Sequence, residues 1–338
     1  MSKGKFWKKI KSNKFYLAIA SIIGAIVLIM LVLYLAVPSY QFNDVEPFHG
    51  EFIYNPYEKT NRINYIDFRS KDIEQQGFKV YEFGYSLGGT RYLCLGYDDK
   101  RIIDYPFLQS VHCKQYNIDK LNNMTKVVAL AHPSKGFGQG ELTHLDHYRV
   151  MEVLSPDDNS LYYWDIALSN GHRVNAIATG DGFTTACLGE NSAELVYKNL
   201  VSGNSYAVKY NGNLIDVPVL QSVTLDSVTM TVAVSQTAKE MRFIGQNAIV
   251  KQSLTDVSEG VYVFQDNDTY IRTEIEFYDG NTLYLNPLIR HQYEHFFDLD
   301  KASVMTGRTY LMWAVYIIVA IAFVRWILLK RKYGNSGE

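Results

Sequence analysis

The 338-residue chain is poor in the residues that mark low-complexity, disulfide-rich and zinc-module proteins. Only 8 prolines and 23 glycines exclude a collagen-like or low-complexity polymer. The three cysteines are odd in number and widely spaced, with no CxxC pair, so neither a disulfide framework nor a zinc module is expected. We therefore expect Cys94, Cys113 and Cys187 to be buried small apolar residues, with one optional disulfide left open. No Walker loop or GxSxG elbow is present.

An excess of positive charge is also missing from the middle of the chain. The formal net charge of −2 conceals six lysines in residues 1–14 and four basic residues against one acidic residue in residues 325–338. Residues 38–308 are left with 23 Lys and Arg against 34 Asp and Glu, a net charge of −11. Because nucleic-acid binding depends on neutralising phosphates with basic side chains, we expect no nucleic-acid partner.

Two long uncharged runs bracket this acidic middle. Residues 15–37 form a 23-residue apolar run that would span about 34 Å as a helix, enough for a hydrocarbon core of about 30 Å. The run is longer than the apolar region of a cleaved signal peptide. Residues 309–329 form the second run, uncharged until Arg325. Both are predicted to be transmembrane helices in contact with the lipid bilayer.

The charges beside the two runs predict an orientation. Basic residues precede the first run and follow the second, which places the tails 1–14 and 330–338 in the cytoplasm. The predicted location is the inner (cytoplasmic) membrane, with two spans and a main domain that is periplasmic or otherwise extracytoplasmic.

The middle of the chain changes character near residue 210. Before it, apolar runs typical of buried strands alternate with helical stretches. The predicted strands lie at 78–85, 91–97, 126–131, 149–153 and 174–179. The predicted helices lie at 109–122, 140–146, 160–170 and 191–202. This rhythm predicts an α/β parallel sheet or barrel over 38–210. Alternating strands with a hairpin signal at residues 279–281 then predict a small antiparallel β-sandwich over 211–290, followed by a juxtamembrane segment, 291–308.

Residues able to bind a metal lie in five short pieces, several at predicted strand ends: 48–52, 81–85, 90–92, 129–133 and 178–183. They contain His49, Glu82, His132 and Asp181, with Glu51 as a further carboxylate. Ends of barrel strands converge at one mouth, and imidazole with carboxylate suits zinc, manganese or iron. A bound metal could activate water for hydrolysis.

The order of these pieces resembles the polymerase and histidinol phosphatase (PHP) family of metal-dependent phosphoesterases, and in particular its membrane-anchored bacterial members. The resemblance covers about residues 45–290 and includes segments 81–85, 104–106, 129–133, 148–154, 164–171 and 178–183. It implies an irregular seven-stranded β/α barrel, here truncated, with a metal cluster at its mouth.

The family's ligand set is incomplete in this chain. The family uses an HxH pair, an Asp-His, a Glu, further histidines and a final Asp-x-His. The resemblance equates His49, Glu82, His132 and Asp181 with four of these ligands. Glu51 stands in place of the second histidine of the first pair, and no segment corresponds to the Asp-His.

Two further substitutions change the chemistry of the implied site. Arg91 stands where a histidine is expected, and Phe183 replaces the final histidine. A permanent cation among carboxylates would neutralise their repulsion and repel a divalent ion. The expected cofactor is therefore none, or a single Zn²⁺ or Mn²⁺ held by the remaining ligands.

Three functions remain open from the sequence. The first is a catalytically impaired PHP-like pseudoenzyme that serves as a binding or assembly component of the cell envelope, with an envelope protein as partner. The second is a phosphoesterase, a hydrolase with fewer metals. The third is a carbohydrate or peptide receptor that uses the barrel cleft.

Overall fold

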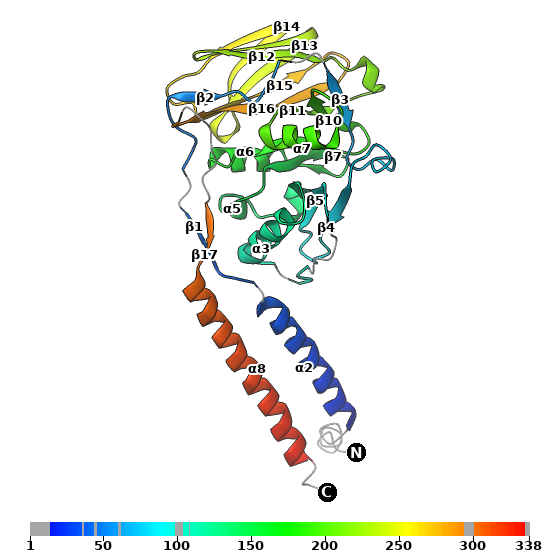
Figure 1. The fold of residues 1–338 in the computed structure, drawn as a ribbon, viewed down its shortest axis with the longest axis vertical. Coiled ribbons are helices and arrows are strands. Elements are labelled where there is room, and N and C mark those ends of the chain that lie inside the picture. Colours follow the sequence, from blue (N-terminus) through cyan, green and yellow to red (C-terminus); the bar gives the residue numbers. More distant parts are fainter. Residues whose placement is uncertain are drawn as a thin grey trace, which may run out of the picture. The chain divides into compact units, whose positions relative to one another are not determined.

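The computed structural model describes residues 14–35, 37–43, 46–59, 62–98, 104–107, 109–293 and 301–334. Most of the predicted tail 1–14, part of the tail 330–338 and residues 294–300 of the predicted juxtamembrane segment lie outside these ranges. The chain divides into two compact units: residues 1–41 with 303–338, and residues 42–302. Figure 1 labels the helices and strands of the second unit, which contains the charged residues of the candidate site.

The first unit contains the helices α2 (Lys14–Leu35) and α8 (Thr306–Gly334). Among the described residues, one segment is long and apolar enough to cross a membrane, Thr306–Leu329 within α8. The apolar stretch Ser21–Met30 within α2 is shorter. The two helices approach closely at Gly24, where an added Cβ would lie 2.8 Å from the ring of Phe323.

The second unit is a mixed α/β structure with a curled half-barrel sheet. Its helical elements are α3 (Val111–Asn122), α4 (Pro133–Gly136), α5 (Gln139–Leu142), α6 (Leu161–Ser169), α7 (Ala193–Ser202), η1 (Leu214–Asp216) and η2 (Gln246–Ala248). Two short strands that pair with each other, β1 (Tyr40–Phe42) and β17 (Ala302–Val304), belong mostly to the first unit.

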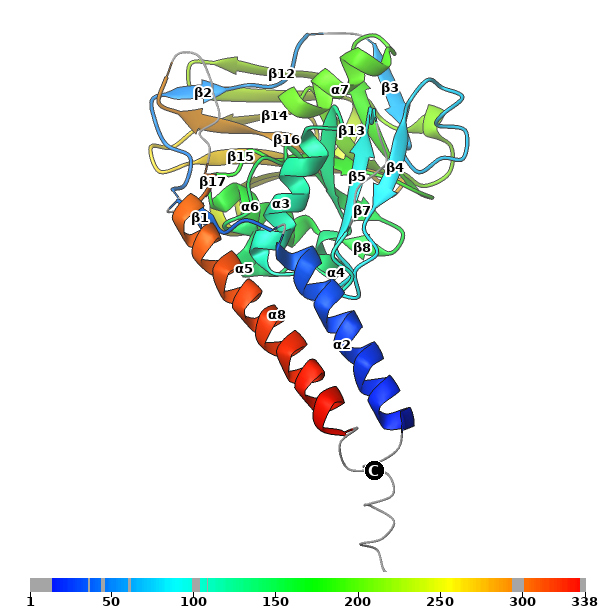
Figure 2. The same cartoon turned by 60° about the horizontal axis from the view of Figure 1, so that its bottom comes forward.

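One sheet has six strands. They are β4 (Val80–Phe83), β5 (Arg91–Leu95), β6 (Val127–Ala131), β7 (Val150–Ser155), β8 (Asp158–Asn159) and β9 (Asn175–Ala178). The strands β6, β7 and β9 are parallel, whereas β4, β5 and β6 pair antiparallel, with β4 and β5 adjacent in Figure 2. The predicted parallel sheet is therefore present only in part, because the short loop between β4 and β5 turns the chain back on itself.

Helices cover both faces of this sheet. In β6, Val128 and Leu130 face the core shared with α3 and α6, while Val127, Ala129 and Ala131 face the core shared with α7. Because side chains alternate along a strand, burial of both faces requires the unbroken apolar run of residues 127–131. The helices predicted at 109–122, 160–170 and 191–202 correspond to α3, α6 and α7.

The other sheet has nine strands and runs through both predicted parts of the middle. Its strands are β2 (Phe52–Tyr54), β3 (Ile63–Ile66), β10 (Phe183–Leu188), β11 (Ser205–Lys209), β12 (Leu220–Asp226), β13 (Thr229–Gly245), β14 (Ile249–Val263), β15 (Tyr270–Glu276) and β16 (Thr282–His291). β11 pairs with β16, so this sheet joins strands from either side of residue 210. The hairpin predicted at 279–281 connects β15 to β16.

Candidate functional site

A cluster of charged side chains lies where several strands end. The described residues Arg69, Glu82, Arg91, His132 and Glu152 form it, and we name it the Arg69 cluster. Glu82 lies near the end of β4, His132 directly follows β6, and Glu152 lies in β7, while Arg91 begins the antiparallel strand β5. The opposite directions of β4 and β5 therefore bring Glu82 and Arg91 to the same edge of the sheet.

Arg69 is at the centre of the cluster. Its Nε donates to Glu152 Oε1 at 2.8 Å, and its Nη2 donates to Glu152 Oε2 at 3.1 Å. Nη1 forms a short ion pair with Glu82. This two-pronged contact with Glu152 is the geometry that a planar guanidinium forms with a carboxylate. One arginine thus compensates two carboxylates.

The backbone after β3 holds Arg69 in this place. Asp67 directly follows β3. Its Oδ1 accepts hydrogen bonds from the backbone N–H of Arg69 at 2.9 Å and from that of Gly180 at 2.8 Å. The second bond ties the segment to the turn after β9. Phe68 between them is buried in the core shared with α7. Arg69 is therefore anchored on both sides before its side chain reaches the carboxylates.

Glu152 is the buried member of the cluster. Its side chain is 0 % exposed and also accepts hydrogen bonds from the Thr179 hydroxyl and from the backbone N–H of His132 at 3.0 Å. Burial by itself would raise the pKa of this carboxyl, but the hydrogen bonds and charge of Arg69 lower the pKa below its usual value. Glu152 is therefore an ionised carboxylate at neutral pH.

The same contacts act on Arg69. Burial by itself would lower the pKa of the guanidinium, but the hydrogen bonds and negative charges of Glu152 and Glu82 raise it above its usual value. Arg69 thus keeps its positive charge throughout the accessible pH range.

His132 is oriented by its neighbours on both ring nitrogens. Arg69 Nη2 lies 3.0 Å from Nε2, and the Ser155 hydroxyl lies 3.2 Å from Nδ1. Because a guanidinium can only donate, Nε2 accepts, and a neutral ring carries its proton on Nδ1. The lone pair of Nε2, which a metal would need, is directed at Arg69. The backbone of His132 has a left-handed conformation with φ of 46°, which turns the chain from β6 into α4.

Arg91 provides a second cation. Its Nε lies 3.6 Å from Glu82 Oε1, and both side chains are about one-third exposed. The central cation among the carboxylates, however, is Arg69, which the sequence analysis did not identify.

Other predicted site residues lie apart from the cluster or at its margin. His49 contacts the Pro47 carbonyl and Gln292, and Glu51 is exposed directly before β2, which pairs with the end of β16. Asp181 lies in the turn after Gly180 with an exposed carboxylate that forms no hydrogen bond or ion pair with a described residue. Phe183 begins β10 and packs against the core as a partly buried side chain.

Glu152 carried a signal that sequence reasoning missed. It is the single charged residue inside the otherwise apolar run 150–154, and a charge within a buried strand requires a partner. Arg69 and Asp67 follow the four-residue strand β3, which has no strong periodic pattern.

The three described cysteines are buried and free. Among the described residues, no group of three or more His, Cys, Asp or Glu side chains is arranged to hold a metal ion. In the Arg69 cluster the carboxylates and the imidazole converge on the guanidinium, so the residues as arranged do not fit a divalent metal.

Comparison of the chain with models of protein families, with curated proteins and with solved structures finds no match.

Proposed function

We propose that this protein is a membrane-anchored, extracytoplasmic PHP-like domain in which a guanidinium has replaced the metal ions. It acts as a binding or assembly component of the cell envelope rather than as a hydrolase. The observation that carries this proposal is the position of Arg69 between Glu82 and Glu152.

The chemistry of Arg69 supports this proposal. A guanidinium supplies the positive charge that a cluster of carboxylates requires, but it has no open coordination position at which water could be activated. It also binds through fixed hydrogen bonds and does not dissociate as a metal does. A divalent ion would have to displace Arg69 from its two hydrogen bonds with the buried carboxylate of Glu152.

The arrangement of strands supports the family resemblance. The residues that the resemblance equates with ligands on β4 and after β6, Glu82 and His132, both contact Arg69. The resemblance left the family's Asp-His without a counterpart in this chain. The segment Asp67–Arg69 after β3 is a candidate for that place, because it follows a strand and reaches the same cluster.

The membrane arrangement is proposed with the same function. Two helices, α2 and α8, would both span the inner membrane with their basic flanks in the cytoplasm. The close approach of the helices at Gly24 supports a packed pair, since small residues allow transmembrane helices to approach closely.

Metal content tests the proposal. Full-length protein purified in detergent without chelators is analysed for zinc and manganese and assayed with bis(4-nitrophenyl) phosphate. We expect well under one metal per chain and no hydrolysis above the rate without protein. The matched variant carries Arg69→His and Arg91→His, which removes both cations and adds two imidazoles beside Glu82 and His132. This variant is expected to gain zinc affinity.

Stoichiometric metal in the wild-type protein together with hydrolysis would instead establish the phosphoesterase with fewer metals. Stoichiometric metal without hydrolysis would also contradict the replacement of metal by Arg69. Specific binding of a saccharide or peptide at the cluster, with neither metal nor protein partner, would favour the receptor.

A further inference from the structure

A second site lies along helix α7, at the other ends of the strands that carry the Arg69 cluster. A pocket of about 710 Å³ is bounded by α7, by the residues that enter β4 and β6, and by the residues that follow β5. Lys126 enters β6 and His132 follows it, six residues later, which corresponds to about 20 Å along a strand. We name this pocket the α7 groove. It is independent of the Arg69 cluster and of the function proposed for it.

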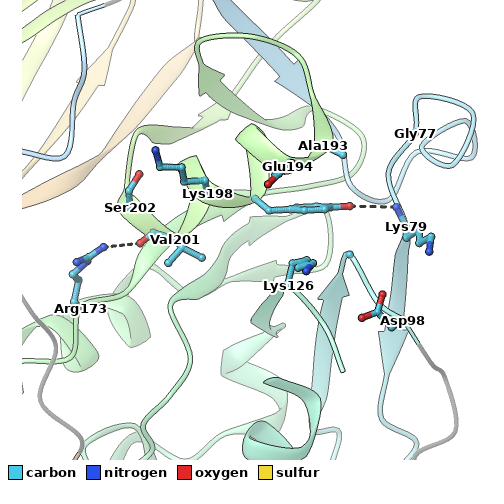
Figure 3. A pocket seen from close by; sticks show the side chains of 12 residues that line it. Gly77, Lys79, Asp98, Lys126, Arg173, Ala193, Glu194, Lys198, Val201 and Ser202 are labelled. Atoms are coloured by element: carbon cyan, nitrogen blue, oxygen red, sulfur yellow. Dashed lines mark hydrogen bonds between the residues drawn. The ribbon is translucent and has the colours of Figure 1, made fainter. Parts of the chain in front are cut away.

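Cationic side chains surround the α7 groove. Four of its lining residues are basic, Lys79, Lys126, Arg173 and Lys198, and two are acidic, Asp98 and Glu194. In Figure 3, Arg173 and Ser202 lie at one end of the groove, Lys79 and Asp98 at the other, with Lys126 and Glu194 between them. The lining therefore carries a net charge of +2 within a central region whose net charge is −11.

The lysines of the groove are available to a ligand. Lys79, Lys126 and Lys198 are exposed, and none of the three forms an ion pair with another described residue. By contrast, Lys114 is paired with Glu141 and Lys251 with Asp268 elsewhere in the unit. Like charges gathered without partners repel one another, and an anion bound between them would relieve that repulsion.

The floor of the groove is apolar and closely packed. Gly96 has a φ of +67°, and an added Cβ would lie 2.7 Å from Lys126 Cγ and 2.8 Å from Tyr197 Cε2, so only glycine lets the lysine stem and the ring meet there. The Tyr197 hydroxyl accepts a hydrogen bond from the backbone N–H of Lys79 at 3.3 Å. Ala193 and Val201 add partly buried apolar surface from α7.

Arg173 is fixed at one end of the groove. Its Nη2 donates to the Val201 carbonyl at 2.7 Å, and its guanidinium lies 5.1 Å from the centre of the Tyr54 ring. The cation is thus held in place before a ligand arrives, which reduces the entropy lost on binding.

We propose that the α7 groove binds a small organic phosphate, with the apolar part of the ligand on the Tyr197 and Val201 side and the phosphate among the lysines. The volume lies within the range of small-molecule sites. A phosphate monoester carries a charge of about −1.5 to −2 at pH 7, which matches the net charge of the lining. A neutral ligand would leave Lys79, Lys126 and Lys198 without a counter-charge, and inorganic phosphate would leave the apolar floor uncovered.

Calorimetric titration of the full-length protein in nanodiscs tests this proposal. The probes are phenyl phosphate, inorganic phosphate and benzyl alcohol, each in 50 mM and 500 mM NaCl. Phenyl phosphate is expected to bind one site per chain at least tenfold more tightly than either other probe. Its affinity is expected to fall in high salt, because exposed charges are screened. No saturable binding of phenyl phosphate, or equal binding of benzyl alcohol, would overturn the proposal.

Variants assign the binding to the groove. Lys126→Gln with Lys198→Gln is expected to weaken phenyl phosphate binding at least tenfold, and the two Lys→Arg replacements to restore it to within about threefold. Lys135→Gln, at an exposed lysine outside the groove, is the matched control and should leave the affinity unchanged. Loss of binding in Arg91→Gln with retention in the double Gln variant would place the phosphate at the Arg69 cluster and refute the groove.

Discussion

At the scale of single residues, the contact between Arg69 and Glu152 is the interaction on which the proposed function depends. Glu152 is 0 % exposed and Arg69 25 % exposed, so the pair is screened little by water. We predict that Arg69→Met lowers the free energy of unfolding by about 3–5 kcal/mol at pH 7, because it leaves a buried carboxylate without a counter-charge. Urea unfolding followed by circular dichroism measures the change.

A double variant separates the charge effect from lost packing. Adding Glu152→Gln to Arg69→Met removes the uncompensated charge and is expected to recover most of the loss. The lowered pKa of Glu152 means that the pair contributes its full stability above pH 4.5 and loses it as the pH falls through the pKa of the folded state. Arg62→Gln, in an exposed pair with Glu190, should change stability by no more than about 0.5 kcal/mol. A loss below about 1 kcal/mol in Arg69→Met would contradict the assignment.

His172 predicts a second pH dependence at the residue scale. Burial, and then the charge of Lys301, lower the pKa of this imidazole to about 4, with Asp146 and Arg149 also facing it. Its Nε2 lies 3.1 Å from the Thr143 carbonyl, so the neutral ring donates there. The unfolded chain takes up this proton near pH 6.5 and the folded chain only near pH 4, so stability decreases as the pH falls between these values.

His172→Gln keeps a donor for Thr143 and removes the titration. Between pH 7 and pH 4 the wild-type protein should lose up to about 3 kcal/mol more unfolding free energy than this variant, because only the wild type has His172 to protonate on unfolding. A difference that stays constant with pH would show that His172 does not titrate in this range.

At the scale of elements, a buried ion network joins α6 to the nine-stranded sheet. Arg272 on β15 donates to Asp165 of α6 at 2.7 and 2.6 Å and also pairs with Glu274, and its side chain is 3 % exposed. Its guanidinium also lies 5.1 Å from the centre of the Trp164 ring. The network therefore positions a helix that packs against β7, the strand of Glu152.

Removal of the Arg272 side chain should destabilise the packing of α6 against the nine-stranded sheet. We predict that Arg272→Met lowers the free energy of unfolding by about 3–5 kcal/mol, because the buried carboxylate of Asp165 loses its counter-charge while Glu274 keeps only Arg242. The matched control is Arg242→Met, which removes a partner of the same Glu274 from a position that is 34 % exposed and should cost about 1 kcal/mol or less. Thermal unfolding of both variants measures the two losses of stability. Equal losses in Arg272→Met and Arg242→Met would contradict the prediction that the buried pair with Asp165 contributes more than the exposed one.

At the scale of the whole molecule, the proposed topology can be tested by cysteine labelling. The three native cysteines are buried, which keeps the background low. Single variants Lys5→Cys, Lys71→Cys and Lys332→Cys are treated with a membrane-impermeant maleimide in spheroplasts. We expect labelling only at position 71 in the acidic middle, and labelling at all three positions after permeabilisation, because basic flanks favour the cytoplasmic face. Labelling of position 5 or 332 in sealed spheroplasts would contradict two spans with both ends inside.

Local patterns in the sequence predicted many of the elements of the structure. The apolar runs at 126–131 and 174–179 became β6 and β9, and the turn signal at 279–281 became the hairpin between β15 and β16. Each of these elements could be predicted from a short segment. An unbroken apolar run indicates a strand that is buried on both faces, and the residues of a tight turn are adjacent in the sequence. The rule that strand ends gather site residues led us to expect Glu82, His132 and Asp181 together. Glu82 and His132 meet around one cation, whereas the carboxylate of Asp181 is exposed and contacts none of them by a hydrogen bond or ion pair.

Which cation lies among the carboxylates was decided only by the tertiary structure. Arg69 is 13 residues from Glu82, 63 from His132 and 83 from Glu152 along the chain, and no periodic pattern links them. The sequence pointed to Arg91 as the cation among Glu51, Glu82 and Asp181, and of these Arg91 pairs with Glu82. The hydrogen bond between Asp67 and the backbone of Gly180 helps to hold the segment that carries Arg69. In the same way, His49 and Glu51 lie near the end of β16 because β2 pairs there. Ion pairs and strand pairing between distant segments depend on how the sheets pack, and packing is a property of the whole fold.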